Sequence, residues 1–359
     1  MRSGSSEAGK WLVRPAAEGD LADLRYLWQA CFGDSDAFTD YYFEDYVGHN
    51  EVLVISEGGH VRSMLHLNPY SFSVRGCEGV LCYIVGVATD PAYRHQGMMA
   101  ALLKKAFHVM AAKGMPMTYL MPADPSIYRS FGFEYIYSRQ LVRSEGKPEG
   151  AAPDWIMGRV SEEDLPALSG RVNDVLSRTY DMFTLRDPAY YRRLMRENQA
   201  DGGDLCFLYQ GDRCVGHFSY ALEDHLEVRE YLAESDAAFL HWLGAAFGGV
   251  RREVLPLLPI KEAVPYEKEF QPIIMGRILD LPSLVRMAGP GGEDFSVRIR
   301  VSDPLIAGND GLWLWTCRQG QVIFERTQGV ADIVTDAGGF WQYLTAYSAL
   351  KKLLINEIV

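Results

Sequence analysis

A single stretch of this sequence decides the predicted fold: Tyr83-Ile-Val-Gly-Val-Ala-Thr-Asp-Pro-Ala-Tyr-Arg-His-Gln-Gly-Met-Met99. An apolar run of β-strand composition meets a turn, and a helix begins near Gly97. The first N–H groups of a helix have no acceptor inside it, and the helix dipole adds partial positive charge there. Gly97 lets the backbone approach closely, and Arg94 adds a permanent cation. The stretch therefore predicts a site for a phosphate-bearing ligand.

The residues that follow make this prediction more specific. Apolar residues recur at helical spacing up to Gly114, namely Leu102, Leu103, Ala106, Val109 and Met110. A short apolar run over 117–121 predicts a second strand, and the turn Tyr128-Arg-Ser-Phe-Gly-Phe133 comes after it. Strand, Arg-x-x-Gly helix, strand and aromatic turn thus occur in one order within about fifty residues.

This order of motifs resembles the GNAT superfamily of acyl-CoA N-acyltransferases. Met64-Leu-His-Leu-Asn-Pro-Tyr70 and the length of 359 residues narrow the resemblance to the enhanced intracellular survival (Eis) family. In that family a second GNAT-like domain and a sterol-carrier-protein-like domain follow the first. The resemblance is carried mainly by residues 64–137, with further motifs in 272–359.

The resemblance implies an α/β (α+β) fold class, with tandem GNAT folds whose mixed central sheets are flanked by helices. We expect an N-terminal catalytic GNAT domain over 1–149 and a second GNAT-like domain over 150–270. An α+β sterol-carrier-like domain over 271–359 would carry the C-terminus to the active site. The turn-rich segment 144–153 agrees with the first boundary. The Arg-x-x-Gly spacing of the second block, Arg213 to Gly216, falls in a predicted strand pair and not at a helix start, so one cofactor per chain is expected.

The resemblance also implies which residues bind acetyl-CoA. Strand-like hydrogen bonds to the pantetheine arm would come from Val87, Ala88 and Thr89. Contacts to the pyrophosphate would come from Arg94, His95, Gln96, Gly97, Met98, Met99 and Ala100. Ala123 and Asp124 would border the cofactor near the second strand.

Amide formation from a thioester and an amine needs an oxyanion donor, a proton for the leaving thiolate and a base for the ammonium. The resemblance assigns the oxyanion donor to the backbone N–H near Val87, on a strand splayed by a bulge. It assigns the acid to Tyr128 and the base to the free α-carboxylate of Val359. Packing of Tyr128 and a plain hydrophobic C-terminal strand are the structural alternatives. The fallback bases are Glu357, Asp124 and His66.

An aromatic cluster near the first helices has two interpretations. It either lines the acceptor pocket or forms the core face of a helix. The cluster contains Phe32, Phe38, Tyr41, Tyr42 and Phe43.

Composition limits the partners. The net charge is −12, with most of the excess acidity after residue 150, so a cationic small molecule is favoured over nucleic acid. No Cys-x-x-Cys or His-Glu-x-x-His motif indicates a metal site, and no apolar segment predicts a membrane span. We expect a cytoplasmic protein, and the family's habit implies a homo-oligomer, specifically a hexamer.

The expected function is acetyl-CoA-dependent N-acetyl transfer to a primary amine, by direct attack in a ternary complex. The family accepts aminoglycosides and polyamines, and a lysine side chain is a further acceptor class. The alternatives are a non-enzymatic lipid or sterol carrier and an acyl-CoA-binding regulatory module without turnover.

Overall fold

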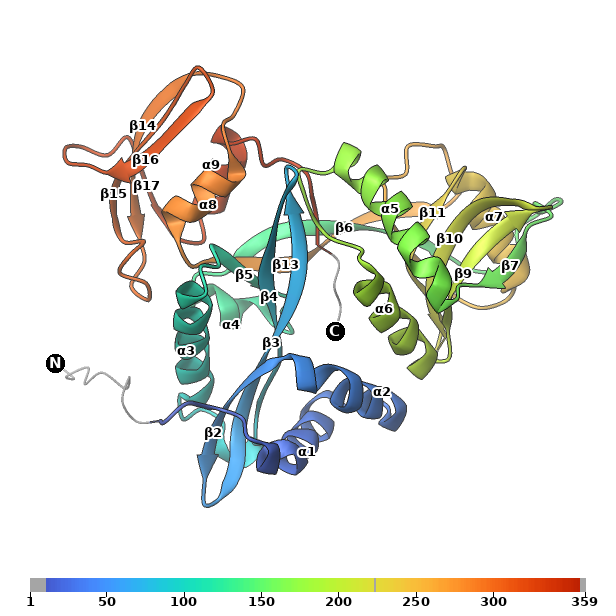
Figure 1. The fold of residues 1–359 in the computed structure, drawn as a ribbon, viewed down its shortest axis with the longest axis horizontal. Coiled ribbons are helices and arrows are strands. Elements are labelled where there is room, and N and C mark those ends of the chain that lie inside the picture. Colours follow the sequence, from blue (N-terminus) through green and yellow to red (C-terminus); the bar gives the residue numbers. More distant parts are fainter. Residues whose placement is uncertain (1–10, 223, 356–359) are drawn as a thin grey trace.

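The computed structural model describes residues 11–222 and 224–355. Fourteen of the described strands form one continuous sheet, and four strands near the C-terminal end form a second. Figure 1 shows the smaller sheet, with α8 and α9, at one end of the molecule. Mixed sheets flanked by helices confirm the predicted α/β class.

The first half of the large sheet is built by a unit that we call repeat 1. Helix α1 buries Leu24, Leu27 and Trp28, and α3 buries Leu102 and Leu103 at the predicted helical spacing. The elements of repeat 1 are β1 (Arg14–Pro15), α1 (Leu21–Phe32), α2 (Asp36–Tyr41), β2 (Glu51–Glu57), β3 (His60–Val74), β4 (Cys77–Thr89), α3 (Met98–Ala112) and β5 (Met117–Leu120). The short helix α4 (Pro125–Arg129) and strand β6 (Glu134–Ser144) follow.

A second unit, repeat 2, has the same order of elements. Its first helical segment begins with a capping box, in which the Ser161 hydroxyl donates to Asp164 at 2.6 Å and the Ser161 amide donates to the same carboxylate. The elements are β7 (Ile156–Arg159), α5 (Leu165–Thr179), β8 (Met182–Thr184), α6 (Pro188–Ala200), β9 (Asp204–Gln210), β10 (Arg213–Leu222), β11 (Leu226–Ala233), α7 (Asp236–Ala246) and β12 (Arg252–Pro256). Strand β13 (Glu267–Ile278) follows, and only β8 has no counterpart in repeat 1.

The large sheet is pseudo-symmetric about its centre. Its strand order is β1-β2-β3-β4-β5-β13-β6-β12-β11-β10-β9-β7, and the same sequence of antiparallel and parallel pairings runs inward from both ends. Strand β6, which follows repeat 1, pairs with β12 of repeat 2. Strand β13, which follows repeat 2, pairs with β5 of repeat 1. The two repeats therefore exchange their last strands, and β6 and β13 join them through an antiparallel pair.

The C-terminal block packs against repeat 1. The expected boundary at 270/271 falls inside β13, so β13 belongs to the large sheet and leads directly into this block. The block contains α8 (Leu281–Ala288), β14 (Phe295–Ser302), β15 (Gly311–Arg318), β16 (Gln321–Arg326), β17 (Ile333–Asp336), α9 (Phe340–Tyr347) and β18 (Leu353–Leu354). Helix α9 ends at Tyr347. Strand β18 pairs with β8, and Leu354 and Ile355 are buried, so the apolar chain end is docked as far as Ile355.

Candidate active site

Strands β4 and β5 separate soon after they meet. Their parallel pairing is confined to Tyr83 and Tyr119, next to a hydrogen bond from the Thr118 hydroxyl to the Cys82 carbonyl at 2.7 Å. Strand β4 continues to Thr89 while it pairs with β3 on its other edge. Its backbone beyond Tyr83 is therefore open toward β5 and can bind an extended ligand arm. Val87, Ala88 and Thr89, which the resemblance assigns to the pantetheine arm, lie on this open segment.

A β-bulge interrupts β4 at the same place. His66 pairs with Val85 and Met64 pairs with Ala88, so Gly86 and Val87 together oppose one residue of β3. Gly86 has a φ of 59°, and a Cβ atom there would lie 2.7 Å from Cζ3 of Trp28. Only glycine fits this position without strain. The bulge confirms the irregular strand that was predicted around Val87.

The residues expected to contact the phosphates lie in the loop between β4 and α3 and in the first turn of α3. His95 has a φ of 60° and Gly97 a φ of 81°, and residues 94–97 are exposed. Helix α3 has no side-chain cap, and its first hydrogen bond runs from the Ala101 amide to the Gly97 carbonyl. The amides of Met98, Met99 and Ala100 therefore have no acceptor within the helix. The Nε atom of Arg94 donates to the Thr89 carbonyl at 3.3 Å, which ties the guanidinium to the end of β4.

A cavity of about 590 Å³ lies where β4 and β5 separate. It is bounded by the ends of β4, β5 and α1, by Tyr128 and by three charged residues of repeat 2. Its lining residues include Trp28, Phe32, Phe38, Val85, Gly86, Val87, Met121, Ala123, Tyr128, Glu197, Asp201 and Arg229. The structure thus brings together Val87, Ala123 and Tyr128, three of the predicted site residues.

Tyr128 lies on α4 with only 9% of its surface exposed. Burial raises the pKa of its hydroxyl to about 12, so Tyr128 is protonated near neutral pH and can act as a proton donor. Its ring contacts that of Phe133 edge-on, with the centroids 5.8 Å apart. The aromatic turn therefore both packs Tyr128 and positions it at the cavity.

The charged side of the cavity comes from repeat 2. Nη1 of Arg229 lies 2.8 Å from Oε1 of Glu197, and its Nη2 lies 2.6 Å from Oδ2 of Asp201. Burial raises the pKa of Glu197 to about 7, although the neighbouring Arg229 acts in the opposite direction. Glu227 also pairs with Arg229, at 3.4 Å. Three carboxylates around one guanidinium leave excess negative charge beside the cavity at pH above 7.

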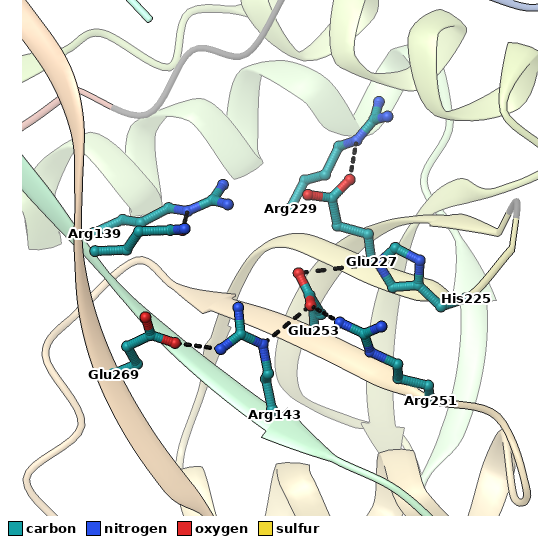
Figure 2. A network of polar contacts seen from close by, with 9 residues as sticks. Arg139, Arg143, His225, Glu227, Arg229, Arg251, Glu253 and Glu269 are labelled. Atoms are coloured by element: carbon teal, nitrogen blue, oxygen red, sulfur yellow. Dashed lines mark hydrogen bonds and ion pairs between the residues drawn. The ribbon is translucent and has the colours of Figure 1, made fainter. Parts of the chain in front are cut away.

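Figure 2 shows that the Arg229–Glu227 pair borders a wider polar network on β6, β12 and β13. Within it, Nε of Arg143 lies 3.1 Å from Oε1 of Glu253, and the same guanidinium contacts Glu269. Sequence reasoning missed Glu197, Asp201 and Arg229. Glu197 lies in α6 and Asp201 is its C-terminal cap residue, but only the docking of the repeats places them beside Tyr128.

One known protein family matches the part of the chain that contains the splayed strands, the loop before α3 and Tyr128. Residues 12–136 match the family model of the acetyltransferase (GNAT) domain. The chain carries a GNAT acetyltransferase domain. The GNAT domain begins just before β1 and ends within β6, so the cavity lies between it and repeat 2.

Three solved structures share the fold over most of the chain. The GCN5-related N-acetyltransferase from Anabaena variabilis is 18% identical, with a TM-score of 0.76 over 94% of this chain and 90% of that one. The GCN5-related N-acetyltransferase from Kribbella flavida is 19% identical, with a TM-score of 0.71 over 94% and 89%. Eis1 from Mycobacterium abscessus is 17% identical, with a TM-score of 0.66 over 92% and 88%. At these identities the likeness establishes the fold. No curated protein matches the sequence.

The candidate bases in and around the GNAT domain differ in their surroundings. His66 is fully buried, its Nδ1 lies 3.1 Å from the Tyr42 hydroxyl, and burial lowers its pKa to about 3. Asp124 accepts the Ser126 amide at the start of α4, and hydrogen bonds from the Ser126 side chain and amide lower its pKa. Both groups are therefore weak bases at neutral pH. Val359 and Glu357 lie outside the described residues.

The two interpretations of the aromatic cluster each hold for some of its residues. Phe32 and Phe38 line the cavity. Tyr41, Tyr42 and Phe43 are buried in the core of the GNAT domain, and the Tyr41 hydroxyl donates to the Arg193 carbonyl of α6 at 3.3 Å.

Two further observations apply to the described part of the chain. None of its helices is both long and apolar enough to cross a membrane. Nor do three or more of its His, Cys, Asp or Glu side chains gather in a group that could hold a metal ion.

Proposed function

We propose that this chain is an acetyl-CoA-dependent N-acetyltransferase that acetylates a primary amine of a cationic small molecule. The observation that carries the proposal is the cavity between the splayed β4 and β5, which joins an open strand edge, a buried tyrosine and a carboxylate cluster. Acetyl-CoA would supply the activated acetyl group. The amides of Met98 to Ala100 and the Arg94 guanidinium fit its diphosphate, because they combine unpaired donors with positive charge.

In this proposal each residue of the cavity has a separate role in acetyl transfer. The Val87 amide on the bulge donates to the carbonyl oxygen as it gains negative charge. The amine nitrogen bonds to the carbonyl carbon, the carbon–sulfur bond breaks, and the Tyr128 hydroxyl gives its proton to the leaving sulfur. Glu197 and Asp201 hold the ammonium group of the acceptor beside this point. Their excess negative charge favours cationic acceptors such as polyamines and aminoglycosides.

The base that removes the ammonium proton has two candidates. The Eis resemblance assigns it to the Val359 carboxylate, and we keep that assignment as a proposal. Glu197 is the second candidate, because it lines the cavity and its pKa of about 7 suits a general base. A chain with a few residues added after Val359 distinguishes these two candidates, because only the first depends on the position of the terminal carboxylate.

The oligomeric state, the Eis membership and the sterol-carrier character of the C-terminal block are also proposals that rest on the resemblance. Sedimentation velocity tests the expected hexamer directly. A single species with the mass of one chain would contradict it.

A thiol-release assay tests the proposed activity. Acetyl-CoA is incubated with the full chain and a panel of aminoglycosides and polyamines, and free CoA thiol is measured. We expect release that requires both substrates, together with an acetylated amine detected by mass spectrometry. Acetyl-CoA binding without release for any amine would favour the regulatory module, and the absence of both would overturn the proposal.

A further inference from the structure

Repeat 2 contains a second cavity at the position that corresponds to the candidate active site. Its volume is about 640 Å³. The active-site cavity is bounded by the ends of α1, β4 and β5. The second cavity is bounded by the ends of α5, β11 and β12, which hold the same places in the strand and helix order of repeat 2. The large sheet therefore forms a cavity on each side of its pseudo-symmetry axis.

Repeat 2 has no open counterpart of the loop between β4 and α3 that is proposed to bind the diphosphate. Eight residues separate β4 from α3, but only Glu234 and Ser235 separate β11 from α7. The Ser235 hydroxyl caps α7, and the Glu262 carboxylate accepts both the Ala237 amide at 3.0 Å and the Ser235 hydroxyl at 2.9 Å. Because a carboxylate of the chain itself already occupies this helix end, a nucleotide diphosphate does not fit there.

The walls of the second cavity are largely apolar. Tyr180, Leu232, Leu258 and Phe270 line it, and Phe270 on β13 is 66% exposed. An exposed phenylalanine beside a cavity offers a surface for an apolar ligand.

The charged side chains at the second cavity differ in whether they have an ion-pair partner. Of its three carboxylates, Glu234 is ion-paired with Arg213, whereas Asp236 and Glu262 accept hydrogen bonds from neutral groups and keep their negative charge. Lys351 donates to the Ala346 carbonyl at 3.0 Å. Lys261 and Lys352 are exposed and form no ion pair within the ranges that the structure describes. Three lysines, Lys261, Lys351 and Lys352, therefore face two carboxylates that have no ion pair in the described part of the chain, which leaves one net positive charge at the cavity.

We propose that the second cavity binds an amphipathic organic anion. The apolar body of the ligand lies against Leu232, Leu258 and Phe270, and its anionic group pairs with Lys261 and Lys352. This site is distinct from the acetyl-CoA site and does not depend on catalysis.

Fluorescence titration with anilinonaphthalenesulfonate, an aromatic anion, tests this proposal on the full chain without acetyl-CoA. We expect saturable binding of one probe per chain, with no displacement by excess CoA. Lys261→Glu should weaken binding about tenfold, because it replaces a weak attraction by a repulsion. Lys147→Glu, which makes the same charge change at an exposed site outside the cavity, should leave the affinity unchanged.

A filling variant gives a second, independent measurement. Leu258→Trp should abolish the titration, whereas Val87→Trp in the active-site cavity should leave it intact. If Leu258→Trp fails to fold, the comparison of Lys261→Glu with Lys147→Glu decides. Absence of saturable binding, displacement by CoA, or equal effects of the two lysine substitutions would overturn the proposal.

Discussion

Tyr128 lines the active-site cavity with a hydroxyl that burial keeps protonated near neutral pH, so it can give a proton to a leaving thiolate. Its place before Phe131-Gly-Phe133 predicted a position at the active site, and its contact with the cavity agrees with that role. The sequence could not predict its burial, which raises its pKa and keeps it protonated. Glu197 is the opposite case, because no local pattern marks it and its neighbours Tyr128 and Val87 lie far away in the chain.

Replacing Tyr128 by phenylalanine removes the hydroxyl and keeps the ring. We expect kcat to fall by about 100-fold, as is typical for loss of a general acid, while the KM for acetyl-CoA stays within a factor of two. Steady-state kinetics measure both values. An unchanged kcat would show that Tyr128 only packs against Phe133.

Glu197→Gln tests charge recognition in the cavity. The folded-state pKa of Glu197 is raised from 4.5 to about 7, so the wild-type carboxylate becomes charged only as the pH rises through about 7. The kcat/KM for a cationic amine should therefore rise through that pH in the wild type. In the variant this rise should disappear, and the acceptor KM at pH 8 should increase about tenfold.

Glu162→Gln is the matched control for Glu197→Gln. Glu162 pairs with Arg192 of α6 at 2.9 Å on an exposed surface, so its replacement should leave both the KM and the pH profile unchanged. A Glu197→Gln enzyme with the wild-type pH profile would refute the role of this carboxylate.

At the scale of elements, local patterns predicted the helices and strands better than they predicted strand partners. The helix expected from near Gly97 to Gly114 corresponds to α3, and the strand expected over 117–121 corresponds to β5. The exchange of β6 and β13 was not predicted, because pairing between distant strands depends on the whole sheet and leaves no local pattern. Strand β11 and helix α7, which complete the repeat, were also missed.

Gly86→Ala tests the bulge on β4. A Cβ atom would approach Trp28 at a position whose φ of 59° already disfavours other residues. We expect a loss of about 1–3 kcal/mol in the free energy of unfolding, together with loss of turnover as Val87 changes orientation. Urea denaturation and the thiol-release assay measure the two effects.

Gly79→Ala is the control for Gly86→Ala on the same strand. A Cβ atom at Gly79 would meet nothing within 4 Å, so both stability and turnover should change little. Equal effects of the two substitutions would show that the bulge has no special role.

At the scale of the whole molecule, the active-site cavity depends on docking of the two repeats. The GNAT domain supplies β4, β5 and Tyr128, and repeat 2 supplies Glu197, Asp201 and Arg229. The order of motifs in the first half predicted one side of this site. The other side follows from the sheet that β6 and β13 join, which sequence patterns did not reveal.

A short extension after Val359 tests the proposed base. If the terminal carboxylate removes the ammonium proton, added residues move it away, and turnover should fall by at least about 100-fold while acetyl-CoA still binds. Isothermal titration and the thiol-release assay measure binding and turnover. Full activity in the extended chain would exclude Val359 and leave Glu197 as the base.

The most direct test of the proposed active site is a crystal structure of the full chain with CoA. We predict that the diphosphate lies on the amides of Met98 to Ala100 beside Arg94, and that the thiol end lies between β4 and β5, next to Val87 and Tyr128. No CoA should occupy the cavity of repeat 2. CoA bound elsewhere, or with its thiol end outside the cavity that Glu197 and Asp201 share, would contradict the proposed active site.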